Sequence, residues 1–219
     1  MSLRLLIIVT VVFATVAFAQ VDTPYQIRYA SNLQFGDSVV NISNTGAQGA
    51  GLNSGTLASV TGALCASAYT FSPDEQMISC CSCPVTPNGL VSLSAKNDLI
   101  SNTLTPAVPT SIVIKLYASV PKSDGCATSA QNPGAPAAGM VAWGTTIHLN
   151  SSNGSYAVTE TPFSPATLSR GVEAAGVYTG GVGSELFRLT QLCNFIVANG
   201  SKYGICGSCR FGGLGAGKM

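Results

Sequence analysis

The stretch that decides the fold is LCASAYTFSPDEQMISCCSC, residues 64–83. Its two ends, Leu64–Phe71 and Met77–Cys83, have the composition of β-strands, and Pro84 ends the second. Between them, Ser72-Pro73-Asp74-Glu75 is typical of a turn. The stretch therefore predicts an antiparallel hairpin, and its second strand carries three cysteines.

Short strands divided by turn residues recur along the chain. The best central strand is 111–118, and 140–149 with 155–160 predict a second hairpin around Asn153-Gly154. One helix is expected over about 184–198, because Ser184 can cap it and apolar residues from Leu186 onward fall on one face. The pattern predicts a mainly β fold of the immunoglobulin-like or β-sandwich type, with one C-terminal helix and disulfide staples.

The first nineteen residues predict a signal peptide. Arg4 precedes an apolar run from Leu5 to Val16, and Ala17-Phe18-Ala19 fits a cleavage site. An uncleaved membrane anchor is the alternative, but the run is shorter than the roughly twenty residues that a bilayer requires. After it we expect an N-terminal strand segment and linker over 20–50, a β-rich domain over 51–210, and a flexible tail over 211–219.

Charge is scarce in this chain. Charged residues make up 9%, against about 25% in typical proteins. With Arg4 removed in the signal peptide, basic and acidic residues balance. The balance argues against nucleic acid and against anionic membrane surfaces as partners. A chain with a net charge near zero associates easily, so self-association is the expected partnership.

The even number of cysteines, together with export, favours disulfides over metal binding. Cys80–Cys83 and Cys206–Cys209 each have the C-x-x-C spacing, so a zinc site and a redox-active pair are the alternatives. The disulfide candidates are Cys65, Cys80, Cys81, Cys83, Cys126, Cys193, Cys206 and Cys209.

Strand geometry limits how these cysteines pair. In an extended chain Cys81 and Cys83 share a face and Cys80 points the other way, so Cys80 and Cys81 should bond to different partners. We expect Cys193 to pair with Cys206 or Cys209. The remaining cysteine of that pair should reach the 80–83 strand.

The sequence contains no recognisable catalytic set, and it predicts no cofactor. The chain has one histidine, His148, which lies beside no nucleophile motif. Asp74-Glu75 fits turn chemistry better than a carboxylate pair for glycoside hydrolysis. Trp143 and the tyrosines suit stacking on sugars, although such residues are more often core or rim.

Two stretches carry a resemblance to other proteins. Residues 69–83 and 204–210 resemble uncharacterised exported proteins of soil bacteria of the acidobacterial kind, and the likeness extends over most of the chain after the signal peptide. It implies export and brings no activity and no site residues. Residues 36–46 are similar to the opening strand of many bacterial immunoglobulin-like surface domains.

Two functions are consistent with these features. The first is a subunit of an extracellular filament or surface assembly. Its 23–29 segment would add a strand to a neighbour and present Tyr25, Ile27 and Tyr29 from one face. The second is a monomeric secreted module that binds or hydrolyses polysaccharide through aromatic rims or a carboxylate pair.

Overall fold

The computed structural model describes residues 23–51, 60–150, 152–169, 181–200, 206–207 and 209–211. The predicted signal peptide, residues 1–19, and the predicted tail after residue 211 lie outside the described residues. No helix in the described part of the chain is long and apolar enough to cross a membrane.

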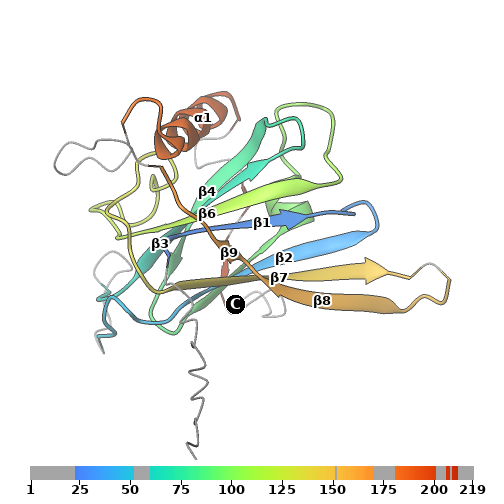
Figure 1. Ribbon diagram of the computed structural model, residues 1–219, viewed down its shortest axis with the longest axis horizontal. Helices are drawn as coiled ribbons and strands as arrows, with labels where there is room; N and C mark the ends of the chain where they lie inside the picture. Colours follow the sequence, from blue (N-terminus) through green and yellow to red (C-terminus); the bar gives the residue numbers. More distant parts are fainter. Residues whose placement is uncertain are drawn as a thin grey trace, which may run out of the picture.

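Two antiparallel sheets, each of five strands within the described ranges, pack face to face (Figure 1). Sheet A has the order β4-β3-β6-β1-β9, and sheet B the order β10-β5-β2-β7-β8. The strands of sheet A are β1 (Tyr25–Ala30), β3 (Leu64–Phe71), β4 (Met77–Val85), β6 (Ile112–Ser119) and β9 (Ser164–Pro165). Those of sheet B are β2 (Gly36–Asn44), β5 (Leu90–Ser94), β7 (Met140–Leu149), β8 (Tyr156–Pro162) and β10 (Arg210–Phe211).

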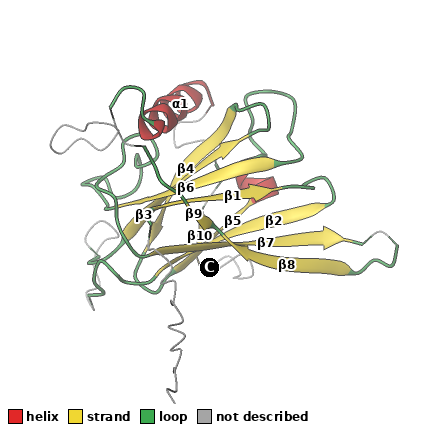
Figure 2. Ribbon diagram, in the orientation of Figure 1, coloured by secondary structure: helices red, strands yellow, loops and turns green. Residues whose placement is uncertain are grey.

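The helix α1 (Glu185–Gly200) forms a third layer on the outer face of sheet A, as Figure 2 shows. Its N-terminus is capped as predicted, because the Ser184 hydroxyl accepts a hydrogen bond from the Phe187 N–H at 3.1 Å. Its buried face packs on the tyrosines of sheet A, and this face consists of Leu186, Leu189, Thr190, Cys193 and Ile196. A single π-helical turn, Ala95–Leu99, follows β5 and was not predicted.

The predicted class is confirmed: the chain is mainly β, with one α-helix in its described part and four disulfides. The narrower immunoglobulin-like label is not confirmed. The core between the sheets is built from alternate residues of the strands, such as Leu93, Ile114 and Leu116, all at 0% exposure. A second core lies between sheet A and α1.

Both predicted hairpins are present. β3 pairs with β4 and β7 pairs with β8, and β6 lies in the middle of sheet A. In the β7–β8 turn Gly154 has φ +68°, which explains the Asn-Gly sequence. Residues 25–44, which lie in the predicted N-terminal strand segment and linker over 20–50, supply one strand to each sheet.

Candidate functional site

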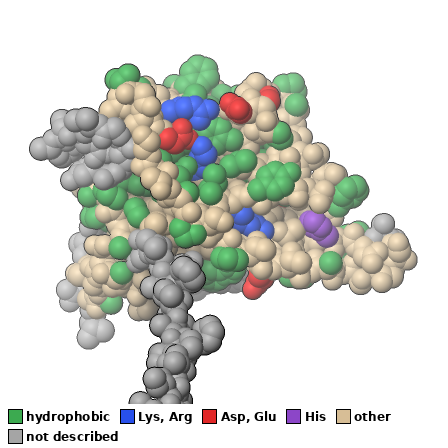
Figure 3. All heavy atoms as spheres, in the orientation of Figure 1, with side chains coloured by type: hydrophobic (Ala, Val, Ile, Leu, Met, Phe, Trp, Pro, Cys, Tyr) green, Lys and Arg blue, Asp and Glu red, His purple; other side chains and the backbone are tan. Residues whose placement is uncertain are grey.

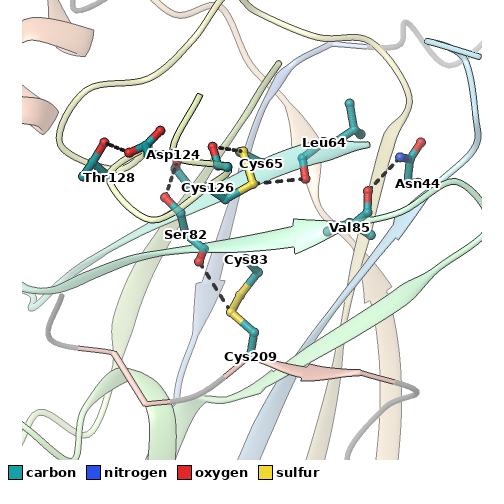
Figure 4. Close-up of a disulfide and its surroundings, with 12 residues drawn as sticks. Asn44, Leu64, Cys65, Ser82, Cys83, Val85, Asp124, Cys126, Thr128 and Cys209 are labelled. Atoms are coloured by element: carbon teal, nitrogen blue, oxygen red, sulfur yellow. Dashed lines mark hydrogen bonds between the residues drawn. A yellow bond between two sulfur atoms is a disulfide. The ribbon is translucent and has the colours of Figure 1, made fainter. Parts of the chain in front are cut away.

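Strand β4 is cross-linked from both of its faces. Cys80 bonds to Cys193 of α1, while Cys81 bonds to Cys206 and Cys83 to Cys209. The prediction that Cys80 points away from Cys81 and Cys83 is confirmed. Figure 4 shows Cys83 joined to Cys209 on one side of β4. These three bridges tie the helix layer, sheet A and the chain segment that enters sheet B as β10 to a single strand.

The predicted pairing of Cys193 with Cys206 or Cys209 is wrong. Cys193 faces the outer side of sheet A, where Cys80 is the cysteine it meets. The segment carrying Cys206 and Cys209 passes on the other side of β4 and packs against the core between the sheets. Sheet A therefore separates Cys193 from the partners we expected for it.

The remaining cysteines join β3 to the loop after β6, through a Cys65–Cys126 disulfide. This bridge lies on the face of sheet A away from sheet B, and Figure 4 shows it on the other side of the strands from Cys83–Cys209. All eight cysteines are oxidised, and Cys80 and Cys83 have different partners. The sulfur atoms therefore form no zinc knuckle in this structure. Four disulfides indicate an oxidising, extracellular environment.

The strand-donor candidates lie on one face of β1, as predicted, but β1 pairs within its own domain. It forms hydrogen-bonded ladders with β6 on one side and β9 on the other. Tyr25 is buried under α1, and Tyr29 is 61% exposed. Ile27 is half-buried. β1 instead directs the polar Gln26 and Arg28, together with the small Ala30, between the sheets.

Arg28 connects the two sheets. Its guanidinium donates to the Ser38 and Thr146 hydroxyls, both at 2.8 Å, and to the Thr161 hydroxyl at 3.1 Å. It lies over Gly144, where a Cβ atom would be 1.7 Å from the Arg28 Nη1. Burial lowers the pKa of Arg28. Through Thr161, this side chain fixes β8 against sheet A.

The residues weighed for glycan chemistry do not come together. Trp143 is half-buried on β7 and faces away from sheet A, whereas Asp74 lies in the β3–β4 turn of sheet A, bonded to the Ser72 hydroxyl. His148 is also on β7, and its Nε2 is buried. The described residues contain no group of three or more potential metal ligands.

One apolar groove lies beside α1. It has a volume of about 410 Å³, and its apolar lining includes Met77, Ile78, Leu104, Leu192 and Phe195. Next to it Lys115 forms an ion pair with Glu185, and both Lys115 and Arg188 lie over the Phe71 ring. These contacts hold the start of α1 on sheet A.

Among the described residues, strand β8 is an open edge of sheet B, with no strand paired on its far side. All seven of its residues are exposed, and it lies along the lower border of the molecule in Figure 1. Its pairing with β7 is regular from residue 156 to residue 162, with no bulge. Tyr156 and Val158 are 66% and 58% exposed, beside Phe35 at 64% and Leu149 at 46%. Sequence reasoning found the hairpin but did not predict that its second strand would stay uncovered.

The buried tyrosines predict a fall in stability at high pH. Burial raises the pKa of Tyr69 and Tyr25 above 10.0, and the charge of Glu185 adds to the effect on Tyr25. The unfolded chain ionises first, so stability is present below pH 10.0 and is lost as the pH rises above it.

Urea denaturation at a series of pH values, followed by Trp143 fluorescence, measures the slope of the free energy of unfolding against pH. Tyr69→Phe should make the slope shallower above pH 10.0, while Tyr29→Phe, at an exposed position, should leave it unchanged. An unchanged slope in Tyr69→Phe would contradict the prediction.

Comparison of the chain with protein families, with curated proteins and with solved structures gave no match.

Proposed function

We propose that this chain is an exported, non-enzymatic structural protein that self-associates into an extracellular filament or surface assembly. The observation that carries the proposal is the open edge of β8. Proteins that remain monomeric usually protect such an edge with lysines, prolines, bulges or a covering element. Residues 156–161 contain no lysine and no proline, the ladder has no bulge, and every side chain of β8 is exposed.

The low charge of the molecule supports the same function. Basic and acidic residues balance once Arg4 is removed with the signal peptide, so copies of the chain do not repel one another at long range. Figure 3 shows few charged side chains on the face of the molecule that it displays. The disulfide staples suit a protein that works outside the cell.

The edge of β8 is better suited than the N-terminal strand β1 to contact a second copy of the chain. β1 already has a hydrogen-bonded neighbour on each side. The face that it directs between the sheets carries the polar Gln26 and Arg28 and the small Ala30. Donating β1 to a second molecule would expose the Ser38 and Thr146 hydroxyls that now bind Arg28.

The test is the association state of the purified, processed protein. Light scattering after size exclusion over a range of micromolar concentrations, with electron microscopy of the same samples, should show dimers or larger ordered assemblies. A chain that remains monomeric at every concentration and forms no ordered assembly would overturn the proposal. Binding or turnover of polysaccharide by that monomer, lost in Trp143→Ala or Asp74→Asn, would favour the glycan alternative.

A further inference from the structure

The free hydrogen-bonding groups of β8 follow from its pairing with β7. The Phe163 N–H donates to the Ala142 carbonyl at 2.9 Å, and the Asn150 N–H donates to the Ser155 carbonyl at 2.8 Å. In an antiparallel ladder, alternate residues bond to the same neighbour. The odd-numbered residues of β8 therefore bond to β7. The backbone groups of Tyr156, Val158 and Glu160 point away from the sheet.

We propose that β8 of a second copy of this chain pairs antiparallel with this edge, about a two-fold axis at Val158. The proposal rests on the self-association proposed above and specifies its contact. Val158 then faces Val158 of the second copy, and Tyr156 faces its Glu160. Three residue pairs exchange about six backbone hydrogen bonds, and the two copies of sheet B become one continuous sheet.

The registers shifted by a step or a half-step from this one fit the edge of β8 less well. A shift of the axis to Glu160 would set two carboxylates directly opposite, which is destabilising. A half-step in the same direction would set Tyr156 against Pro162, which has no N–H to donate. A half-step toward the turn would set Glu160 against Gly154, whose N–H already donates to the Asn150 carbonyl at 2.9 Å.

The side chains of the outward residues fit the same arrangement. Tyr156 and Val158 lie on the face of sheet B that turns away from sheet A, next to Ile147 and Leu149 of β7. A two-fold axis at Val158 joins this patch to its copy in one apolar stripe. In this register Glu160, the only charged residue of β8, lies opposite Tyr156 of the second copy. A two-fold contact closes on itself, so it makes a dimer the unit of any larger assembly.

Charge substitutions at Val158 test the axis directly. Val158→Lys sets two ammonium groups opposite each other, and Val158→Glu sets two carboxylates opposite each other. Each variant alone should associate at least about tenfold more weakly than the native chain, and an equimolar mixture should regain native association because the charges then pair. Sedimentation velocity of each sample measures the effect. Val108→Lys is the matched control, since Val108 is 60% exposed and belongs to the segment before β6 of sheet A; it should associate as the native chain does.

A second variant separates the backbone contact from charge. Val158→Pro removes the central outward N–H and leaves the bonds to β7 in place, a position where edge strands accept proline. It should weaken association while keeping the native urea midpoint. If the native chain associates and the three Val158 variants associate equally well, or if the Lys and Glu variants do not rescue each other, the β8 axis is wrong but self-association stands. If the native chain is monomeric, both proposals fail.

Discussion

Replacing Cys65 and Cys126 together by alanine should lower the free energy of unfolding by about 4 kcal/mol, the largest effect of removing any one disulfide. This bridge closes a loop with a sequence separation of 61 residues, and no other bridge has its two ends close to both Cys65 and Cys126. Both sulfur atoms are buried, so alanine is preferred to serine at these positions.

The other three disulfides are partly redundant although their loops are longer. Their separations are 113, 125 and 126 residues, but they join neighbouring positions of β4 to neighbouring positions of the C-terminal region. When the other two bridges of β4 are present, the Cys80–Cys193 bridge closes an additional loop of only about fifteen residues. Its removal should therefore lower the free energy of unfolding by about 3 kcal/mol. The two bridges to 206 and 209 contribute about 2 kcal/mol each in the same way.

Urea denaturation of the four double alanine variants measures the loss in the free energy of unfolding that each disulfide accounts for. The three bridges of β4 should also be strongly non-additive, so removing all three together should cost more than the sum of the three separate losses. Equal destabilisation of the Cys80–Cys193 and Cys65–Cys126 variants would contradict this prediction.

Asn44→Ala should destabilise the fold by about 3 kcal/mol, because three backbone groups, one buried at Val85 and two half-buried at Gly46 and Gly62, would lose their partner. Asn44 is fully buried at the end of β2. Its amide donates to the Val85 carbonyl at 2.9 Å and to the Gly62 carbonyl at 2.8 Å, and its side-chain oxygen accepts from the Gly46 N–H at 2.9 Å. Figure 4 shows the bond to Val85, which connects sheet B to the end of β4.

Asn41→Ala is the matched control for Asn44, since it changes the same residue type in the same strand. Asn41 is half-buried, its amide donates to the Thr145 hydroxyl and its oxygen accepts from the Ser92 hydroxyl, so its loss leaves no backbone group without a partner. Its loss should cost about 1 kcal/mol or less. Equal losses in the two variants, by urea denaturation, would show that the Asn44 contacts do not hold the sheets together.

The local elements of this fold could be predicted because their signals are short-range. Ser184 marks the start of α1 and Asn153-Gly154 marks the β7–β8 turn, since a cap and a turn depend on a few adjacent residues. The opposite facing of Cys80 and Cys81 also followed, because side chains alternate along a strand. The π-helical turn at Ala95–Leu99 was missed, because its cap at Ser94 follows a strand with no apolar repeat after it.

The candidate site was only half predictable. We expected the face that carries Tyr25, Ile27 and Tyr29 to pair with a neighbouring molecule. The alternation of these residues shows that they share a face, but it does not show which layer covers that face. In the structure α1 covers Tyr25, and the β1 edge is paired on both sides. The uncovered edge belongs to β8, whose sequence predicts a strand but carries no sign of its place in the sheet order.

The sequence by itself determined the two hairpins, the central strand of sheet A, the helix cap and the opposite faces of Cys80 and Cys81, because each depends on residues within a few positions of one another. The tertiary structure alone decided that Cys193 bonds to Cys80, that Arg28 spans the two sheets and that β8 ends sheet B. Those outcomes join residues far apart in the chain, and they depend on which layers pack together rather than on any local repeat.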